Sequence, residues 1–406
     1  MKKDRFETLK ETRERRKHQK CSVYEIKIDK SHLSKEKHEY LKKAFLEAKW
    51  LYNYLLATND IKNASTKCKE VIVLNKDKEE EIRYLENISS QMKQGILERI
   101  ISSTKMLKTK IERGRENEVG RLKFKSEYNS IPLKQFGVTY KIINDKYIKL
   151  QGFKKPFRVI GLKQIPEDAE IANANLVRIA GDYYFKITCF TKKEERVKTN
   201  KKIGLDFGIM DNITTSNGDK INISVPESKG IKKASKKMNK AKKGSKNRFK
   251  RKIKLRKEYK KNSNKKKDIA NKVVSKLKRE NDMICIQDES IHEWHQEKTK
   301  GYSKVVQYSA MGGIIAELKQ HSATLVIDKY FCSTKKCRNC GKLNDISTKV
   351  RTYSCDCGYS FDRDVHAALN ILEEGIRICT ERTNKMPVGA VTKGDCVDAG
   401  SLYALA

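Results

Sequence analysis

Apolar residues recur with a helical period over two long segments near the N-terminus. Residues 35–60 and roughly 78–113 each place their apolar positions on one helical face, and Gly114 marks the expected stop of the second helix. The two faces consist of Leu41, Ala44, Phe45, Ala48, Leu51, Tyr52 and Leu55, and of Leu85, Ile88, Met92, Ile96, Ile100 and Leu107. Two long amphipathic helices with basic outer faces predict a helical lobe.

A period of two, typical of half-buried strands, marks three other segments of the N-terminal half. Residues 22–29 alternate apolar and polar side chains, and residues 139–150 and 175–190 have the pattern of β-hairpins. We expect the second hairpin to turn at Gly181 and Asp182. If strand 22–29 joins both hairpins in one β-barrel, the helical lobe is an insertion into that barrel.

Strands and helices alternate in the C-terminal half, which predicts an α/β layer. We expect strands within 202–216, followed by a turn at Asn217-Gly218, and at 283–290 and 324–329, with helices at about 303–320 and from about 364. The ends of the chain lack such patterns. Residues 1–20 are densely charged and are expected to be mobile until bound, and the tail after about 380 is predicted to be disordered.

Charge changes this picture most. The 406 residues include 90 Lys and Arg against 51 Asp and Glu, a formal net charge of +39. So much like charge favours a polyanionic partner, and nucleic acid is the obvious one. Residues 229–279 hold 25 Lys or Arg and two acids, so this stretch is either a nucleic-acid surface or a solvated, disordered charge run. Membrane coating is the weaker alternative for the whole chain.

Targeting signals are not apparent in this sequence. No stretch approaches the ~18 apolar residues that cross a membrane, and the first twenty residues lack the apolar segment of a signal peptide. We therefore expect a protein of the reducing cytoplasm, where clustered cysteines bind metal rather than form disulfides.

Four of the eleven cysteines cluster late in the chain. Two residues separate Cys337 from Cys340, one separates Cys355 from Cys357, and a glycine follows each pair. Four thiolates in this pattern predict a closed tetrahedral zinc site, with buried free cysteines as the alternative. Cys332 is interpreted as a packing residue. The remaining cysteines are scattered and interpreted as structural, namely Cys21, Cys68, Cys189, Cys285, Cys379 and Cys396.

Several acids stand where a rigid element could hold them for metal binding. Asp206 interrupts an apolar strand, where a charge is unfavourable unless it is paired or bound to metal, although an Asp at a strand end can also cap a turn. Asp288 and Glu289 follow the next apolar strand, and spacing alone does not choose between them. Asp362 and Asp364 open the last helix, where capping is an equally available role. Converging carboxylates would suit divalent ions that hydrolyse phosphodiesters.

Taken in order, four motifs resemble the TnpB family of RuvC-like nucleases, which are encoded by insertion sequences and related to type V CRISPR effectors. They are GRLKFKSEYNS, IGLDFGIMDNITTSNGD, ICIQDESIHEW followed by SAMGGIIAELK, and CRNCG with YSCDCGYSFDRDVHAALNIL. The resemblance covers about 120–400 well and the N-terminal lobe only in outline.

The resemblance implies a choice among the acids. The family's last catalytic acid precedes Val-x-Ala-Ala, which selects Asp364 over Asp362. The commoner form of the second motif has its acid at the position of Gln287, but this sequence is similar to the subgroup with a Gln-Asp-Glu pattern, which selects Glu289. Asp288 is the substitute if Glu289 is not the ligand.

The implied cofactors are a pair of Mg²⁺ ions and one structural Zn²⁺. Asp206, Glu289 and Asp364 would be the catalytic magnesium ligands. The zinc ligands would be Cys337, Cys340, Cys355 and Cys357. The implied partners are a transposon-derived guide RNA and double-stranded target DNA, with a monomer favoured and no membrane contact.

The implied fold is a multidomain α/β protein. An RNase H-like RuvC nuclease domain would be interrupted by a zinc ribbon and preceded by a β-barrel, the wedge, with an inserted helical recognition lobe. The expected parts are an arm and first wedge strand at 1–34, the recognition lobe at 35–118, the rest of the wedge at 119–200, the nuclease at 201–331 with a basic insertion at 229–279, the ribbon at 332–360, the end of the nuclease at 361–380 and the tail at 381–406.

The expected function is RNA-guided cleavage of DNA next to a short flanking motif. A type V-F CRISPR nuclease would share this chemistry, but the tail MPVGAVTKGDCVDAGSLYALA resembles the ends of transposon-encoded members. A nuclease-dead, RNA-guided repressor is a second alternative, against which all three acids argue. A transposase that catalyses strand transfer ranks lower still.

Overall fold

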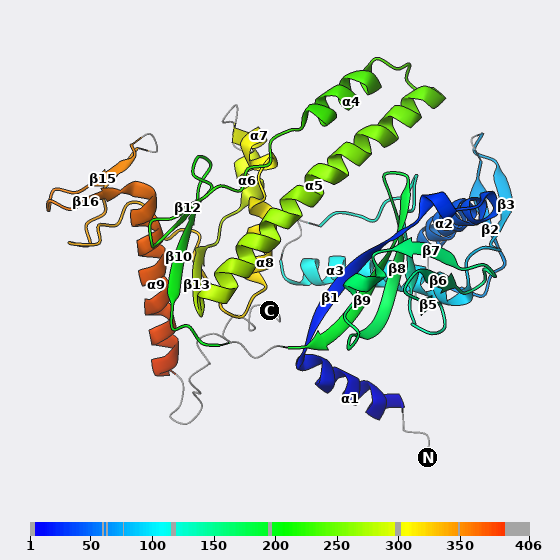
Figure 1. Ribbon diagram of the computed structural model, residues 1–406, viewed down its shortest axis with the longest axis horizontal. Coiled ribbons are helices and arrows are strands. Elements are labelled where there is room, and N and C mark those ends of the chain that lie inside the picture. The colour runs from blue at the N-terminus through cyan, green and yellow to red at the C-terminus, as the bar shows by residue number, and fades with distance from the viewer. Residues whose placement is uncertain are drawn as a thin grey trace. The chain divides into compact units, whose positions relative to one another are not determined.

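The computed structural model describes residues 5–58, 61, 64–75, 77–114, 119–193, 197–296, 302–347 and 350–385. The chain divides into two compact units, Met1–Glu195 and Arg196–Ala406, and each has its own sheets and core (Figure 1). Among the helices of the described ranges, none is long and apolar enough to cross a membrane.

The first unit is built on a seven-stranded antiparallel sheet in the order β4-β8-β9-β1-β7-β6-β5. Its strands are β1 (Gln19–Ile28), β4 (Ser130–Leu133), β5 (Tyr140–Asn144), β6 (Tyr147–Leu150), β7 (Phe157–Ile160), β8 (Glu170–Ile179) and β9 (Asp182–Lys192). The hydroxyl of Tyr140, on the last strand of this order, donates to the carbonyl of Ala172 on β8 at 2.8 Å. The sheet therefore curls into a nearly closed barrel, and strand β1 lies at its centre between both predicted hairpins.

The β8–β9 turn lies one residue earlier than predicted. Ile179 pairs with Asp182, so Ala180 and Gly181 form the turn, with φ of 51° and 79°. Two positive φ values match the twist of a two-residue hairpin turn. Gly181 adopts this conformation without strain, and Ala180 is a non-glycine residue with a positive φ.

Two long helices cover the barrel unit, as the apolar pattern predicts. Helix α2 (Lys35–Ala57) and helix α3 (Ser90–Glu112) begin at Ser34 and Ser89, whose hydroxyls accept backbone N–H bonds from the first turn. Most of the predicted apolar positions are buried in one core with the barrel.

The second helix starts later than expected. Residues 78–89 are not helical, because β2 (Glu70–Leu74) and β3 (Glu80–Tyr84) form a hairpin whose turn is held by the Asn75 side chain. Leu85 and Ile88 happen to continue the helical spacing of α3 while lying outside it. The N-terminal arm also differs from expectation: it forms α1 (Arg5–Lys17), and Arg15 pairs with Glu170 of the barrel at 3.0 Å.

The second unit contains a five-stranded sheet in the order β12-β11-β10-β13-β14. Its strands are β10 (Lys202–Phe207), β11 (Ile213–Thr215), β12 (Lys220–Ile221), β13 (Met283–Gln287) and β14 (Thr324–Ile327). Strands β10, β13 and β14 are parallel, and β11 and β12 are antiparallel to their neighbours. Helix α9 (Arg363–Lys385) packs on one face, and α5 (Lys246–Glu280) and α8 (Met311–Lys319) pack on the other (Figure 1).

Glycines bring α9 unusually close to this sheet. A Cβ on Gly204 of β10 would lie 2.1 Å from the carbonyl oxygen of Ala368, and one on Gly375 would lie 2.3 Å from the Cys285 sulfur. The helix therefore rests almost directly on β10 and β13.

The remaining helices depart from the predicted pattern in two places. The expected helix at 303–320 is two helices, α7 (Tyr302–Gln307) and α8, separated by Tyr308–Ala310, and α6 (Ile291–Gln296) precedes them. The basic stretch is ordered as α4 (Lys229–Asn239) and α5, so the disordered alternative is wrong. The apolar positions of α5, chiefly Val274 and Leu277, are buried against the five-stranded sheet.

The cysteine segment carries a small hairpin, β15 (Thr352–Ser354) and β16 (Ser360–Asp362), directly before α9. Helix α9 continues to Lys385, past the predicted start of the tail. Residues 386–406, which include Cys396, lie outside the described residues.

Candidate active site and metal centre

The four clustered cysteines converge on one point. Their sulfur atoms all lie within 4.8 Å of one another. The Cys337 and Cys357 sulfurs are 3.7 Å apart, and those of Cys340 and Cys355 are 3.6 Å apart. Two thiolates bound to one zinc ion at about 2.3 Å would lie about 3.8 Å apart in a tetrahedron, so the arrangement fits zinc.

Local turns create this arrangement. The glycine after each cysteine pair has a positive φ, 74° for Gly341 and 84° for Gly358, which lets the chain turn back toward the sulfurs. Burial opposes ionisation of Cys337, but N–H bonds from the Asn339 and Cys340 backbones outweigh it and lower the pKa of this thiol. A lowered pKa favours the thiolate that zinc requires.

The other cysteines stand apart from this centre. Cys332 is exposed and its sulfur does not belong to the group, so its interpretation as a packing residue is wrong. Cys189 and Cys285 are buried in the two cores, as expected for structural residues, whereas Cys21 is exposed.

Asp206 lies on β10, on the face of the sheet that α9 covers. Its neighbour Leu205 points to the opposite face and is fully buried there. Desolvation, followed by the negative charges of Asp364 and Glu289, raises the pKa of Asp206 to about 7. An acid with this pKa is only about half ionised at pH 7, and a nearby cation would favour its charged form.

Asp364 lies in the first turn of α9, and its carboxylate binds two arginines. Arg351 donates to one oxygen at 3.0 Å, and Arg363 donates to the other through Nε at 3.1 Å and Nη2 at 2.9 Å. Asp362 has a different role, because its side chain accepts the backbone N–H groups of Asp364 and Val365 and so caps the helix.

Glu289 follows the end of β13 and is half-buried. Desolvation and the neighbouring Asp288 raise its pKa, and Lys329 and Lys319 partly offset this. Asp288 itself is exposed and forms an ion pair with Lys319. Of this pair, Glu289 is the acid whose charge acts on Asp206.

The structure thus brings the three predicted acids into one electrostatic neighbourhood. They come from β10, the end of β13 and the start of α9. Their oxygens are less tightly gathered than the thiolates, because within the described part of the chain the four cysteines are the only group of metal-ligand type found close enough to hold one ion directly. Carboxylates that share a pair of ions and water ligands can stand further apart than thiolates around one zinc.

Several parts of the chain are similar to known proteins. Residues 185–292 match a family model described as "Probable transposase", and residues 316–371 match one described as "Cas12f1-like, TNB domain". A Streptomyces pristinaespiralis protein named "Putative RNA-guided DNA endonuclease" is 26% identical over 232 residues, which cover 55% of this chain and 57% of that protein.

A mimiviral relative and a solved structure extend the comparison. The "TnpB-like protein L79" of Acanthamoeba polyphaga mimivirus is 30% identical over 129 residues, which cover 28% of this chain and 24% of that protein. The structure described as "Cryo-EM structure of the Cas12f1-sgRNA-target DNA complex" matches with a TM-score of 0.55 at 13% identity, covering 87% of this chain and 99% of that one. This last likeness is one of fold.

Parts of this chain are therefore similar to TnpB-like proteins and to a protein named as an RNA-guided DNA endonuclease. The matches to the curated relatives span little more than half of their length at most. The first family model covers Asp206 and Glu289, and the second covers the four cysteines and Asp364.

Sequence analysis missed the cations beside these acids. Besides the two arginines, Lys220 donates to Asp211 at 2.9 Å and to Asp362 at 3.3 Å. Arg363 could have been noticed because it directly precedes Asp364. Arg351 lies thirteen residues away, so only the folded ribbon reveals its contact with this acid.

Sequence analysis also missed the role of Gln287, at the position of the acid in the commoner form of the motif. Its side chain is buried and makes four hydrogen bonds within the protein. It is therefore a structural residue here rather than a ligand.

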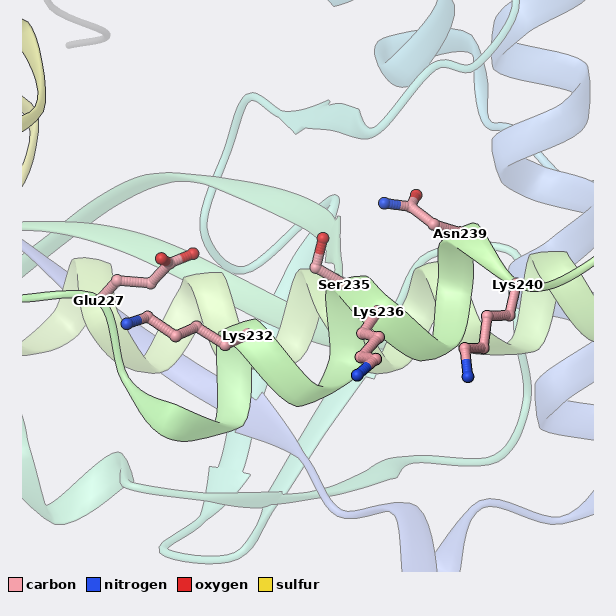
Figure 2. A pocket seen from close by; sticks show the side chains of 6 residues that line it. All are labelled: Glu227, Lys232, Ser235, Lys236, Asn239 and Lys240. Carbon is pink, nitrogen blue, oxygen red and sulfur yellow. The ribbon is translucent and has the colours of Figure 1, made fainter.

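A basic groove runs along α4 (Figure 2). Lys232, Lys236 and Lys240 follow one another at intervals of four residues, or about 6 Å along a helix, and their side chains are exposed. The lining residues are Glu227, Lys232, Ser235, Lys236, Asn239 and Lys240. Evenly spaced ammonium groups beside neutral hydrogen-bonding side chains suit a phosphodiester backbone.

Proposed function

We propose that this chain is a TnpB protein, a transposon-encoded, RNA-guided DNA endonuclease that cuts target DNA next to a short flanking motif. Cleavage would be two-metal hydrolysis in a single RuvC-like site. The main observation behind this proposal concerns the pKa of Asp206. The negative charges of Asp364 and Glu289 both help to raise it, although the three acids come from distant parts of the chain.

The fold around the acids supports this proposal. A sheet with three parallel strands and two antiparallel ones, in the order β12-β11-β10-β13-β14, is the strand arrangement of RNase H-like nucleases. Asp206 lies on β10, the first of these strands along the chain, and Glu289 follows β13, the fourth. Asp364 lies on α9, the helix that packs on this sheet.

The chemistry assigns each acid a part. Magnesium ions held by Asp206, Glu289 and Asp364 would supply the activation of water and the stabilisation of the leaving oxygen. The raised pKa of Asp206 and its two acidic neighbours make this carboxylate a strong attractor of divalent cations. Arg351 and Arg363 place positive charge where a phosphate would enter.

The four thiolates would hold one structural zinc ion. Their sulfur-to-sulfur distances fit this ion, and the segment that contains them leads directly into α9 and Asp364. The zinc-bound segment would therefore stabilise the start of the helix that carries the third acid.

The basic surfaces would hold guide RNA and DNA through their backbones, while base pairing selects the target. Helices α4 and α5 supply most of the basic residues of 229–279, including the lysine groove of Figure 2. The barrel and the helices of the first unit would serve as the wedge and recognition lobe, which hold the flanking motif and the guide–target duplex.

Plasmid cleavage tests the proposal. The protein is copurified with its RNA, the RNA is sequenced, and a plasmid carrying the matching target is incubated with magnesium or with a chelator. We expect linear DNA only with a matching target and magnesium. Cleavage that ignores the guide, or persists when magnesium is chelated, would contradict the proposal.

A type V-F CRISPR nuclease is the second candidate, favoured by the Cas12f1-like domain match and the Cas12f1 fold. The two candidates share one chemistry and differ in the source of the guide. An RNA that maps to the end of a mobile element supports the first candidate, and one that maps to a CRISPR array supports the second.

A further inference from the structure

Gln287 is the last residue of β13, and both polar atoms of its side chain are hydrogen-bonded within the protein. Its Nε2 group donates to the carbonyl oxygens of Asp328, Lys329 and Phe331 at 3.2, 3.0 and 2.8 Å, and its Oε1 accepts from the Ser333 hydroxyl at 3.0 Å. The side chain is only 7% exposed. It therefore ties the segment after β14 to the strand that leads to Glu289.

The Gln287 amide lies next to Asp206 in the sheet. Leu205 pairs with Ile286, so the next residues of the two strands, Asp206 and Gln287, are neighbours on the face covered by α9. A carboxylate at position 287 would direct one of its oxygens at three carbonyl oxygens, which repel it. The amide instead supplies two N–H donors, which the three carbonyls share.

A second amide ties the same segment to α9. The Nδ2 group of Asn370 donates to the carbonyl oxygens of Ser333 and Lys336, at 2.6 and 2.8 Å. Nε2 of His366 donates to the Lys336 carbonyl at 2.9 Å, and its ring stacks on Tyr353 of the ribbon with centroids 3.9 Å apart. The carbonyl of Lys336 directly precedes the zinc-type ligand Cys337.

Ser333 is the residue shared by both ties. Its hydroxyl reaches Gln287 on β13 and its carbonyl reaches Asn370 on α9, and all three side chains are buried. We call Gln287, Ser333 and Asn370 the amide latch. Glu289 lies two residues after one end of the latch, and Asp364 lies six residues before the other.

We propose that Gln287 and Asn370 are positioning residues for DNA cleavage. The amide latch fixes the distance between Glu289 and Asp364, and it holds the elements that carry these acids against the segment that leads to the thiolates. This inference rests on the proposed nuclease function. Both side chains are buried and hydrogen-bonded to groups of the protein, so each would act through the acid on its own element. Loss of such supporting groups around metal ligands typically weakens activity or metal affinity about 10–100-fold.

The test uses Gln287→Met and Asn370→Leu, which keep approximate size and remove the donors. The measurements are single-turnover cleavage of the guide-matched plasmid over a magnesium titration, zinc content, and guide-dependent DNA binding. We expect cleavage at limiting magnesium to fall about 10–100-fold, with partial recovery at high magnesium, one zinc retained and DNA binding unchanged.

Asn262→Leu is the matched control. Asn262 is a buried amide of the same unit whose Nδ2 donates to the Pro226 carbonyl at 3.3 Å, on α5 and away from the acids. This variant should lower the unfolding temperature without shifting the magnesium dependence. A shift equal to that of Gln287→Met would show that the latch effect is only a general loss of stability.

An acid swap keeps the proposal falsifiable if a latch variant fails to fold. Glu289→Gln should be inactive, and the double variant Gln287→Glu with Glu289→Gln should stay inactive. Restored cleavage would show that position 287 lines the metal site and would overturn the latch, as would wild-type magnesium dependence in Gln287→Met. A wild-type protein that cuts no guided target would instead refute the nuclease proposal itself.

Discussion

The thiolate centre and the carboxylate centre are built in opposite ways. All four sulfurs come from residues 337–357, and two glycine turns bring them within 4.8 Å of one another. The three carboxylates come from positions 206, 289 and 364, and only the packing of β10, β13 and α9 brings their charges together. A centre made from one segment depends on local turns, whereas a centre made from three depends on the whole unit.

The largest expected effect comes from removing an acid. Asp206→Ala, Glu289→Ala and Asp364→Ala should each reduce plasmid cleavage about a thousandfold or more, because each deletes several kcal/mol of metal-based stabilisation. Guide-dependent DNA binding, measured by gel shift, should persist because it uses basic residues elsewhere. Asp288→Ala is the control and should cut normally; the reverse outcome at positions 288 and 289 would reassign the second ligand.

Gly204→Ala should impair the carboxylate centre and leave the thiolate centre intact. The new Cβ would clash with the Ala368 carbonyl and with Leu372, so α9 must move away from β10 and carry Asp364 with it. We expect a loss of about 1–3 kcal/mol in stability and about a hundredfold loss of cleavage, with zinc still bound. Gly208→Ala, whose added Cβ meets no atom within 4 Å, is the control. Normal cleavage by Gly204→Ala would show that the acids do not depend on this packing.

Cys337→Ser should act on the thiolate centre first. Zinc content, measured by mass spectrometry of the metal, should drop from about one to near zero, because a three-thiolate site holds zinc poorly. Cleavage should fall in turn as the segment before α9 loosens. Cys332→Ser is the matched control, since this exposed cysteine lies outside the group, and it should keep its zinc. Zinc loss in the control would add Cys332 to the ligands.

The smallest expected effect is a pH-dependent change in stability. The pKa of Asp206 is about 7 in the folded protein and near 3.8 when unfolded, so the folded state holds this proton more tightly and loses stability as pH rises between these values. In metal-free protein, Asp206→Asn should therefore raise the unfolding temperature at pH 8 by about 2 °C or more, and much less at pH 5.

Magnesium should reverse this difference. At pH 8 the ion should stabilise the wild type and have little effect on Asp206→Asn, because the variant lacks the charge that binds it. Equal stabilisation of both proteins by magnesium would place the ion elsewhere.

Regular elements were the most predictable part of the fold. The barrel hairpins and the parallel strands appear where alternating or continuous apolar runs predicted them, because side-chain periodicity reflects one buried face. The failures occurred where periodicity misleads. Leu85 and Ile88 extend the spacing of α3 back to the end of the β2–β3 hairpin, and α5 is a helix whose first half has few apolar residues to reveal it.

The candidate site was only partly predictable for a related reason. Motif spacing marked all three acids, but choosing Glu289 over Asp288 and Asp364 over Asp362 required the family resemblance. In the structure Asp288 pairs with Lys319, and Asp362 caps α9, so both have separate partners. The arginines on Asp364 and the four bonds of Gln287 were not predicted.

The thiolate cluster, the large positive charge and the strands that carry acids could be predicted from sequence, because each depends on residues near one another in the chain. Which acids influence one another's charge, and which polar groups support them, became known only from the packing of distant segments. Gly204 and Gly375 let α9 rest on the sheet, and this close approach brings residues 206 and 364 together across more than 150 positions. Such contacts arise from packing between elements, which no local pattern encodes.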